Sequence, residues 1–229
     1  MWVPLRAHLG ISRARPISLT LVKDGRRLRM NVRDPADLAT LGEVLLDELY
    51  HVPDLRDVRT IVDLGSHIGC SIVFFRVRHP GARIHGLEPD PRTFAELRAN
   101  VAPFEGVTID PRAVSGSGGE ATFYCSDNTL ASSLFGEGRP VPVRTVGLDA
   151  LMDELGLEQI DLLKLDVEGA EYDALAAMTR LDAVRAIAGE LHPHLIRHSA
   201  DDFFELLRDY RIWIDCLSPT SWQFHALRA

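Results

Sequence analysis

Acidic residues and a histidine stand at the ends of two apolar runs, where such side chains can bind hydroxyl groups or move protons. Asp166 follows the run Leu162–Leu165, and Glu190 and His192 lie at the end of the run that begins at Ala186. A histidine has the pKa of a general base near neutrality, and a carboxylate can orient its ring or bind a substrate. The ordinary alternatives are a helix cap for Asp166 and a solvated loop position for His192. We favour a catalytic role for both, with Glu190 as their partner.

The same three residues, Asp166, Glu190 and His192, could instead hold a divalent metal ion that binds a substrate diol, because carboxylates and an imidazole form an acceptable ligand set. No tight ligand motif demands this ion, so a metal is not expected. Lys164 could accept a proton if it were partly desolvated, but an ion pair with Asp166 is the favoured interpretation. Glu171 is interpreted as an acidic residue in the first turn of a helix.

A glycine loop, Asp63–Gly69, lies between an apolar run and a helical pattern. The run Thr60–Leu64 predicts a strand, and the residues from Ser71 onward predict a helix. Gly65 and Gly69 allow the backbone to approach a ligand closely, and the N-terminus of the helix offers unpaired N–H groups. Loops of this kind hold nucleotides, and the alternative is a tight turn with nothing bound.

Glu88 follows the next predicted strand, Arg83–Leu87, and would lie beside the glycine loop in a parallel sheet. A carboxylate there can hold a ribose diol through two charge-assisted hydrogen bonds. Its alternative role is to cap the following helix, but Asp90 suits that role better. The pattern therefore favours a ligand that contains a nucleoside.

The spacing of the loop separates two classes of cofactor. A dinucleotide fingerprint requires three glycines, but His67 and Cys70 occupy the second and third of those places. Asp63 is placed to orient the loop and to face a cationic ligand such as a sulfonium or its amino group. S-adenosylmethionine is therefore favoured over NAD.

The elements that must position these residues begin at Thr60, where short apolar runs start to alternate with helical patterns. This alternation predicts an α/β fold, a doubly wound and mostly parallel sheet with helices on its faces. The predicted strands are Thr60–Leu64, Arg83–Leu87, Val107–Ile109, Leu162–Leu165, Ala186–Glu190 and Arg211–Leu217. The predicted helices are Ser71–Arg78, Pro91–Val101, Glu168–Met178 and Ala200–Tyr210.

Four further segments are less regular. Glu120–Tyr124 and Val141–Val146 are interpreted as extra β or loop structure, and Ser221–Leu227 as a last edge strand, antiparallel to its neighbour. The segment Cys125–Pro140 is rich in Ser, Gly and Asn, and within it residues 132–134 could cover a cofactor.

The N-terminal part predicts a small β-hairpin and a helix. Ile17–Lys23 and Arg26–Val32 alternate apolar and polar side chains around an Asp-Gly turn, and Asp34–Tyr50 has apolar residues at helical spacing. A chain of 229 residues with 46% hydrophobic content is expected to form one domain. Residues 1–57 would form the ribbon and helix, and residues 58–229 the cofactor-binding core.

The composition of the chain limits which partners and which cellular location we expect. A formal net charge of −8 disfavours binding to a phosphate backbone, so we expect no nucleic-acid partner. Three widely spaced cysteines fit neither a disulfide framework nor a zinc site, so a cytoplasmic location is expected. Residues 1–10 lack the apolar run of a signal peptide, and no run is long enough to predict a membrane span.

Four segments together resemble the FkbM family of S-adenosylmethionine-dependent methyltransferases. They are Val62–Gly69, Leu87–Pro89, Arg112–Ser115 and Leu163–Glu171. The Lys-x-Asp-x-Glu-Gly-x-Glu run in the last of them is the most specific part, whereas the glycine loop is common to most class I methyltransferases. The family's loop usually reads Asp-x-Gly-Ala-Asn-x-Gly, so a serine and a histidine replace a small and an amide residue here.

The resemblance implies a class I fold with a seven-stranded sheet and methyl transfer, usually to oxygen, on acceptors such as natural products and glycans. It places the adenine near Ala113-Val114-Ser115, although ordinary strand packing explains that tripeptide equally well. The residues expected to bind or shape the cofactor site are Asp63, Gly65, Ser66, His67, Gly69, Ser71, Glu88, Pro89, Ala113, Val114 and Ser115.

The expected reaction is the transfer of a methyl group to a hydroxyl of a small molecule or sugar. Methyl transfer is an in-line displacement, so positioning of the acceptor does most of the work. Two other functions remain as alternatives, an NAD-linked oxidoreductase and a methyltransferase-like binding domain without activity. A homodimer is compatible with the short chain, because a neighbouring subunit could complete the acceptor pocket.

Overall fold

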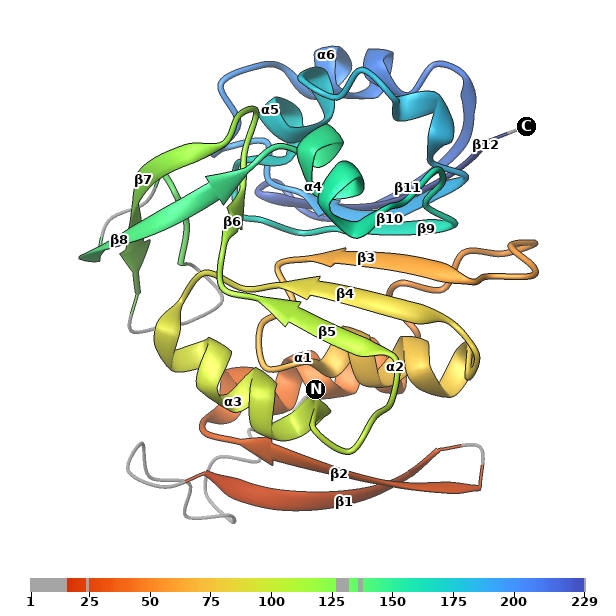
Figure 1. The fold of residues 1–229 in the computed structure, drawn as a ribbon, viewed down its shortest axis with the longest axis vertical. Helices are drawn as coiled ribbons and strands as arrows, with labels where there is room; N and C mark the ends of the chain where they lie inside the picture. The colour runs from red at the N-terminus through yellow and green to blue at the C-terminus, as the bar shows by residue number, and fades with distance from the viewer. Residues whose placement is uncertain (1–15, 24, 127–131, 136–137, 229) are drawn as a thin grey trace.

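The computed structural model describes residues 16–23, 25–126, 132–135 and 138–228. A seven-stranded sheet runs through the middle of the molecule (Figure 1), and its strands lie in the order β11-β12-β10-β9-β3-β4-β5. All neighbouring strands are parallel except β12, which is antiparallel to both β10 and β11. The strands are β3 (Thr60–Leu64), β4 (Arg83–Leu87), β5 (Val107–Asp110), β9 (Leu162–Leu165), β10 (Ala186–Leu191), β11 (Tyr210–Ser218) and β12 (Ser221–Arg228).

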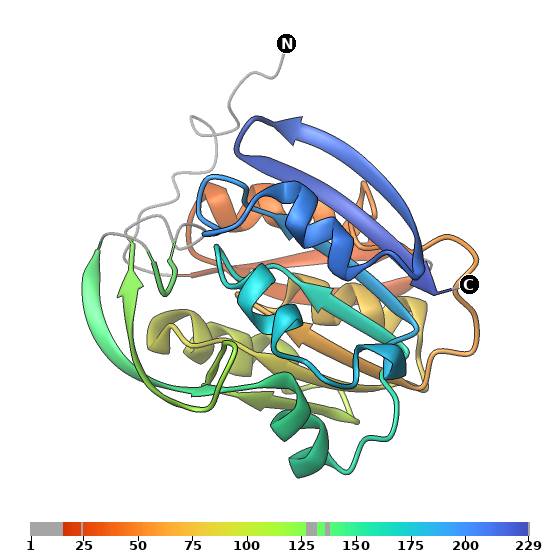
Figure 2. The ribbon, with the colours of Figure 1, turned by 90° about the horizontal axis from the view of Figure 1, so that it is seen from above.

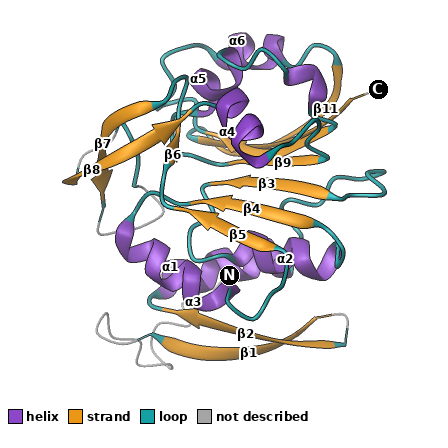
Figure 3. Ribbon diagram, viewed as in Figure 1, coloured by secondary structure: helices purple, strands orange, loops and turns teal. Residues whose placement is uncertain are grey.

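The predicted doubly wound α/β fold is confirmed, because helices cover both faces of this sheet (Figure 3). Two apolar cores lie on its opposite faces, one under the first three helices and one under the last three. The helices are α1 (Pro35–Leu45), α2 (Cys70–Arg78), α3 (Pro91–Val101), α4 (Leu148–Leu155), α5 (Glu171–Ala176) and α6 (Ala200–Leu206).

The last strand differs from its prediction in one respect. It is antiparallel, as expected, but it lies inside the sheet, and β11 forms the edge. The pattern of burial gives the reason, because Phe224 and Ala226 of β12 are fully buried whereas Ile214 of β11 is 46% exposed. Figure 2 shows this hairpin in blue along one side of the molecule.

Two helices are shorter than predicted because the backbone turns left-handed beside them. The predicted helix Asp34–Tyr50 ends at Leu45, and Glu48 has a φ of 56°. The predicted helix Glu168–Met178 begins only at Glu171, because Glu168 and Gly169 have φ values of 54° and 105°. The predicted helix Ala200–Tyr210 also ends early, at Leu206.

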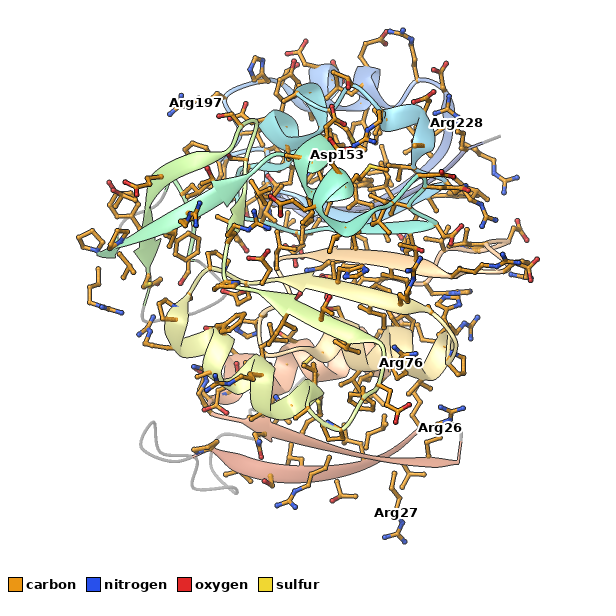
Figure 4. The ribbon with its side chains drawn as sticks, in the orientation of Figure 1. Arg26, Arg27, Arg76, Asp153, Arg197 and Arg228 are labelled. Atoms are coloured by element: carbon orange, nitrogen blue, oxygen red, sulfur yellow. The ribbon has the colours of Figure 1, made fainter. Side chains whose placement is uncertain are left out.

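A two-stranded ribbon of β1 (Ile17–Lys23) and β2 (Arg26–Val32) packs on the helices rather than joining the central sheet, as predicted. Leu28, Met30 and Val32 face the core, and the ribbon's turn projects the exposed Arg26 and Arg27 away from the molecule (Figure 4). The ribbon and the sheet thus share one apolar core.

A second small sheet stands beyond the carboxyl ends of the central strands. It joins β6 (Ala113–Val114), β8 (Arg139–Val146) and β7 (Gly119–Cys125), so the segments interpreted as extra β structure are strands. Residues 127–131 and 136–137 of the segment Cys125–Pro140, and residues 1–10, lie outside the described residues, whereas residues 132–134, predicted to cover the cofactor, are described. Among the residues described, no helix is both long and apolar enough to cross a bilayer.

Candidate functional site

A cavity opens where the carboxyl ends of β3, β4 and β9 meet. Ligands of open α/β sheets bind at this end of the strands. Residues of the glycine loop, of the Glu88 segment and of the Asp166 segment all reach it. Its lining residues are Gly65, His67, Leu87, Glu88, Pro89, Arg112, Ala113, Val114, Phe123, Ser132, Leu134, Asp166, Val167 and Glu168.

The glycine loop is held from inside the protein. Asp63 is fully buried, accepts a hydrogen bond from Ser71 Oγ at 2.6 Å, and has its other oxygen 3.5 Å from Lys164 Nζ. Ser66 Oγ donates to the carbonyl of Asp63 at 3.0 Å. Asp63 therefore faces Lys164, and it shapes the loop together with the two serines from behind the cavity wall.

The two glycines of the loop have different roles. A Cβ atom on Gly65 would lie 1.9 Å from the carbonyl oxygen of Asp166, so the loop and the end of β9 could not approach each other with a larger residue there. A Cβ atom on Gly69 would lie 3.0 Å from side chains of Leu97 and Val101. Gly65 thus shapes the cavity, whereas Gly69 lets α3 pack against the loop.

Lys164 is the buried centre of this framework. Its Nζ donates to the carbonyls of Gly65 and Leu64 at 2.5 and 3.2 Å, and it lies 3.3 Å from Asp166 Oδ2. Burial alone would lower its pKa, but the charges of Asp166 and Asp63 raise that pKa above its ordinary value. The predicted ion pair with Asp166 is confirmed, and a protonated Lys164 is not a base.

Glu88 is a buried carboxylate in the wall of the cavity. Its Oε2 accepts a hydrogen bond from the backbone N–H of His67 at 3.0 Å, and its Oε1 accepts one from the N–H of Asp90 at 2.8 Å. Each oxygen retains a lone pair for a further donor. Burial raises the pKa of Glu88 to about 7. Asp90 caps α3, as predicted.

His67 connects the cavity to the N-terminal helix. Its φ is 48°, and its Nε2 lies 3.5 Å from Oδ1 of the fully buried Asp37. Burial lowers the pKa of His67 to about 4, so the ring is neutral at physiological pH. The side chain thus forms part of the cavity wall next to Glu88.

The far wall of the cavity is mostly apolar. Ala113 and Val114 line it, and so do Phe123 of β7 and Leu134 of the covering segment. Ser115 points elsewhere, because its Oγ donates to the carbonyl of Ser117 at 2.7 Å and it lines a separate hollow. Phe123 was not predicted, although the alternation of Ala121, Phe123 and Cys125 with Thr122 and Tyr124 is the sequence signal for a side chain on one face of β7.

Three predicted residues, Asp166, Glu190 and His192, come together next to the cavity, where Glu168 and Glu171 join them; of the five, Asp166 and Glu168 line the cavity itself. His192 Nδ1 donates to Glu171 Oε1 at 2.9 Å. Its Nε2 lies 3.4 Å from Glu168 Oε1 and 3.9 Å from Glu190 Oε1. We call these five residues the acidic cluster.

Glu168 and Glu171 were not predicted to act here. The left-handed turn at Glu168 and Gly169 delays the helix, so Glu168 remains beside the end of β9 and lines the cavity. Glu171 is completely buried and also accepts a hydrogen bond from the N–H of Gly169 at 2.9 Å. The adjacent Glu-Gly pair was the available sequence signal for that turn.

The charges in the acidic cluster depend on one another. Burial alone lowers the pKa of His192, but the hydrogen bond to Glu171 and the surrounding carboxylates raise it to about 10. Burial raises the pKa of Glu168 to about 8 and also raises that of Glu190. In Asp166 the charges of Lys164 and His192 outweigh burial, and its pKa is lowered. His192 therefore carries a proton at neutral pH.

Two hydroxyl groups from distant segments complete this end of the site. Tyr50, which follows α1, donates to Asp166 Oδ2 at 2.9 Å, and Ser221 at the start of β12 donates to Glu190. Burial raises the pKa of Tyr50 well above its ordinary value, so its hydroxyl stays a donor. Both contacts fix carboxylates that face the cavity end.

Solved structures support the fold. A precorrin-6y C5,15-methyltransferase from Geobacter metallireducens has a TM-score of 0.50 and 15% identity, with 86% of this chain and 90% of that chain covered. The Methanococcus jannaschii fibrillarin pre-rRNA processing protein has a TM-score of 0.52 and 11% identity, with 93% and 89% covered. These likenesses concern the class I methyltransferase architecture alone.

Sequence relatives identify the family. The 31-O-demethyl-FK506 methyltransferase FkbM of Streptomyces tacrolimicus is 30% identical over 189 residues, which cover 66% of this chain and 72% of that protein. The 2-O-methyltransferase NoeI of Sinorhizobium fredii is 32% identical over 135 residues, 51% of this chain and 56% of that protein. Residues 63–212 match the methyltransferase FkbM domain, and the chain therefore belongs to the FkbM methyltransferase family and is a methyltransferase.

Proposed function

We propose that this protein transfers the methyl group of S-adenosylmethionine to a hydroxyl of a small molecule or a sugar. One observation carries the proposal: a single cavity is lined both by the anchored carboxylate of Glu88 and by Asp166 and Glu168 of the acidic cluster. Oxygen as the acceptor is supported by the names of two relatives, a 31-O-demethyl-FK506 methyltransferase and a 2-O-methyltransferase.

The cofactor would occupy the Glu88 end. Glu88 accepts hydrogen bonds from the two ribose hydroxyls, and the adenine lies against Ala113, Val114 and Phe123. The loop from Gly65 to Gly69 surrounds the amino-acid part, supported from behind by Asp63, Ser66 and Ser71. Pro89 adds an apolar contact beside the ribose. Support for this placement comes from the lining of the cavity and from the lone pairs that Glu88 keeps free of the backbone.

The acceptor would occupy the end next to Asp166, Glu190 and His192. Its oxygen must lie about 3–3.5 Å from the methyl carbon, opposite the sulfur. As the new C–O bond forms, the C–S bond breaks and S-adenosylhomocysteine leaves. The hydroxyl proton passes to a carboxylate of the cluster, because His192 is already protonated at neutral pH. Asp166 suits that role, because its pKa is lowered and its carboxylate is therefore ionised at neutral pH, whereas Glu168, with a pKa of about 8, is mostly protonated there.

The first test is isothermal titration of the protein with S-adenosylmethionine, S-adenosylhomocysteine and NAD. We expect micromolar binding of both sulfur ligands, and its loss in Glu88→Ala. Glu158→Ala is the matched control, because Glu158 is an exposed glutamate in the turn before β9. If the folded protein bound neither sulfur ligand, or if NAD bound instead, the proposal would be wrong.

Turnover is tested next, with methyl-labelled cofactor and a panel of hydroxylated acceptors. Incorporation of label into an alkali-stable ether product would support transfer to a hydroxyl. Label recovered only as an alkali-labile ester would assign the reaction to a carboxyl acceptor, and the hydroxyl assignment would fail.

A further inference from the structure

We propose that Asp166, Glu168 and His192 bind one divalent cation, which holds the acceptor oxygen beside the methyl donor. The binding of the ion is argued from the geometry of this chain alone, whereas its role in catalysis rests on the proposed function. The sequence offered Asp166, Glu190 and His192 as possible ligands. In the structure Glu168, rather than Glu190, lies with Asp166 and His192 at metal-binding spacing.

The three donor atoms are close enough to share an ion. One carboxylate oxygen each of Asp166 and Glu168 and a ring nitrogen of His192 lie within 4.8 Å of one another. Two ligands at about 2.1 Å from one ion are separated by at most about 4.2 Å. Glu168 Oε1 and His192 Nε2 are already only 3.4 Å apart, and a shift of less than about 1 Å within the set would bring all three donor atoms inside that limit.

His192 is held as a metal-binding histidine usually is. Its Nδ1 donates to Glu171 Oε1 at 2.9 Å, and only 7% of its side chain is exposed. Glu171 is itself fixed by the N–H of Gly169 and is fully buried. In metal sites, a carboxylate that accepts the second ring N–H sets the tautomer and orientation of the ligand. This arrangement directs Nε2 toward Glu168 and Glu190, a property that a surface group of acids would lack.

The local charge favours a cation. Four carboxylates, those of Asp166, Glu168, Glu171 and Glu190, meet within the acidic cluster. Lys164 pairs with Asp166 Oδ2 at 3.3 Å, but its charge is shared with Asp63 and with two loop carbonyls. In the proposed state the ion, rather than a proton, lies between His192 Nε2 and the carboxylates.

The ligand set also indicates a class of acceptor. Two carboxylates and one imidazole suit Mn²⁺ or Mg²⁺ and leave coordination positions open. Those positions face the cavity, because Asp166 and Glu168 line it. An acceptor with two neighbouring oxygens, such as a vicinal diol, could occupy two of them, and the bound hydroxyl would lose its proton more easily.

The test uses Mn²⁺ with the purified, full-length protein and no cofactor. Electron paramagnetic resonance measures free Mn²⁺, and we expect one bound ion per chain with a Kd well below about 1 mM. Glu168→Gln should weaken binding at least about tenfold, and Glu171→Gln about 10–100-fold through loss of the support for His192. Glu158→Gln, on an exposed glutamate, should leave it unchanged.

Binding of S-adenosylhomocysteine to each variant reports whether the fold is intact. No Mn²⁺ binding below about 1 mM, or binding that is equal in Glu168→Gln and the native protein, would overturn the proposal. Because Mn²⁺ is measured without cofactor, such a failure leaves the methyltransferase proposal unaffected. If the native protein bound Mn²⁺ but did not bind S-adenosylhomocysteine, the proposed function would be wrong instead.

Discussion

The two ends of the cavity are built differently. At the cofactor end, Glu88 and the loop 63–69 are held by backbone N–H groups and carbonyls of adjacent turns. At the acceptor end, side chains from segments far apart in the sequence meet, among them those of Tyr50 and Ser221, and most of their partners are other side chains. The Glu88 end therefore needs the adjacent strands β3, β4 and β9, whereas the acidic cluster also needs segments as distant in sequence as Tyr50 and Ser221.

Lys164 contacts both regions, the glycine loop through Gly65 and the acidic cluster through Asp166, and its substitution should have the largest effect on stability. Lys164→Met leaves the buried carboxylate of Asp63 without its ion-pair partner, so we expect the free energy of unfolding to fall by about 3–5 kcal/mol. Urea denaturation measures it. The only other lysine, Lys23, is the control: it pairs with Glu48 nearer the surface, and Lys23→Met should cost about 1 kcal/mol or less. Equal losses would show that the central ion pairs do not hold the two ends together.

His192→Asn tests whether the ends act separately. We expect kcat to fall by about 10²–10⁴-fold, because an oriented group of the acceptor end is lost. The Kd of S-adenosylhomocysteine should change by less than about threefold, since His192 touches no residue of the cofactor loop in the described structure. Glu88→Ala should show the reverse pattern, with a Kd raised about 100-fold. Similar Kd changes in both variants would contradict the division.

The pH dependence of cofactor binding sharpens the same division. Ribose hydroxyls donate to the ionised form of Glu88, and burial raises the pKa of Glu88 to about 7. Below that pH the carboxyl group must first lose its proton before the ribose can bind. The affinity for S-adenosylhomocysteine should therefore be constant above pH 8 and fall about tenfold per pH unit below about pH 6.5. Titration calorimetry across this range measures it, with Glu88→Gln expected to show a flat profile. A flat profile for the native protein would remove Glu88 from the ribose site.

Tyr50→Phe should produce the smallest change. The variant loses one hydrogen bond to Asp166 Oδ2 but keeps its ring against Phe75, so the free energy of unfolding should fall by about 1 kcal/mol. Thermal unfolding measures the change, and cofactor affinity should not move. A larger loss of cofactor binding than of stability would mean that the acceptor end also supports the cofactor end.

Local patterns predicted the elements around Glu88 well, because each of them is a short contiguous signal. The hairpin strands, β3, β4 and β9 have their predicted bounds, and Glu88 follows its strand as expected. The acceptor end depends on contacts between distant residues. Tyr50 and Asp166 are 116 positions apart, and no local pattern relates them. The helix α4 was also missed, although Leu148, Leu151 and Met152 have helical spacing.

Errors in the prediction had local physical causes as well. Glu171 stands in the first turn of its helix, as interpreted, but its complete burial after the left-handed turn at Glu168 and Gly169 and its hydrogen bond with His192 were not predicted. The order of β11 and β12 was reversed because an antiparallel hairpin can add to a sheet by either strand. Only the burial of Phe224 and Ala226 decides between the two arrangements.

The inner position of β12 has a consequence for synthesis of the protein on the ribosome. Strand β10, which carries Glu190, pairs with β12 along its whole length, from Ala186 opposite Leu227 to Leu191 opposite Trp222. Until residues 221–228 emerge, β10 presents an apolar strand with one open edge, which is a template for pairing with other chains. Nascent chains that stop before Ser221 should therefore aggregate or require a chaperone, even though the glycine loop and Glu88 have already been made.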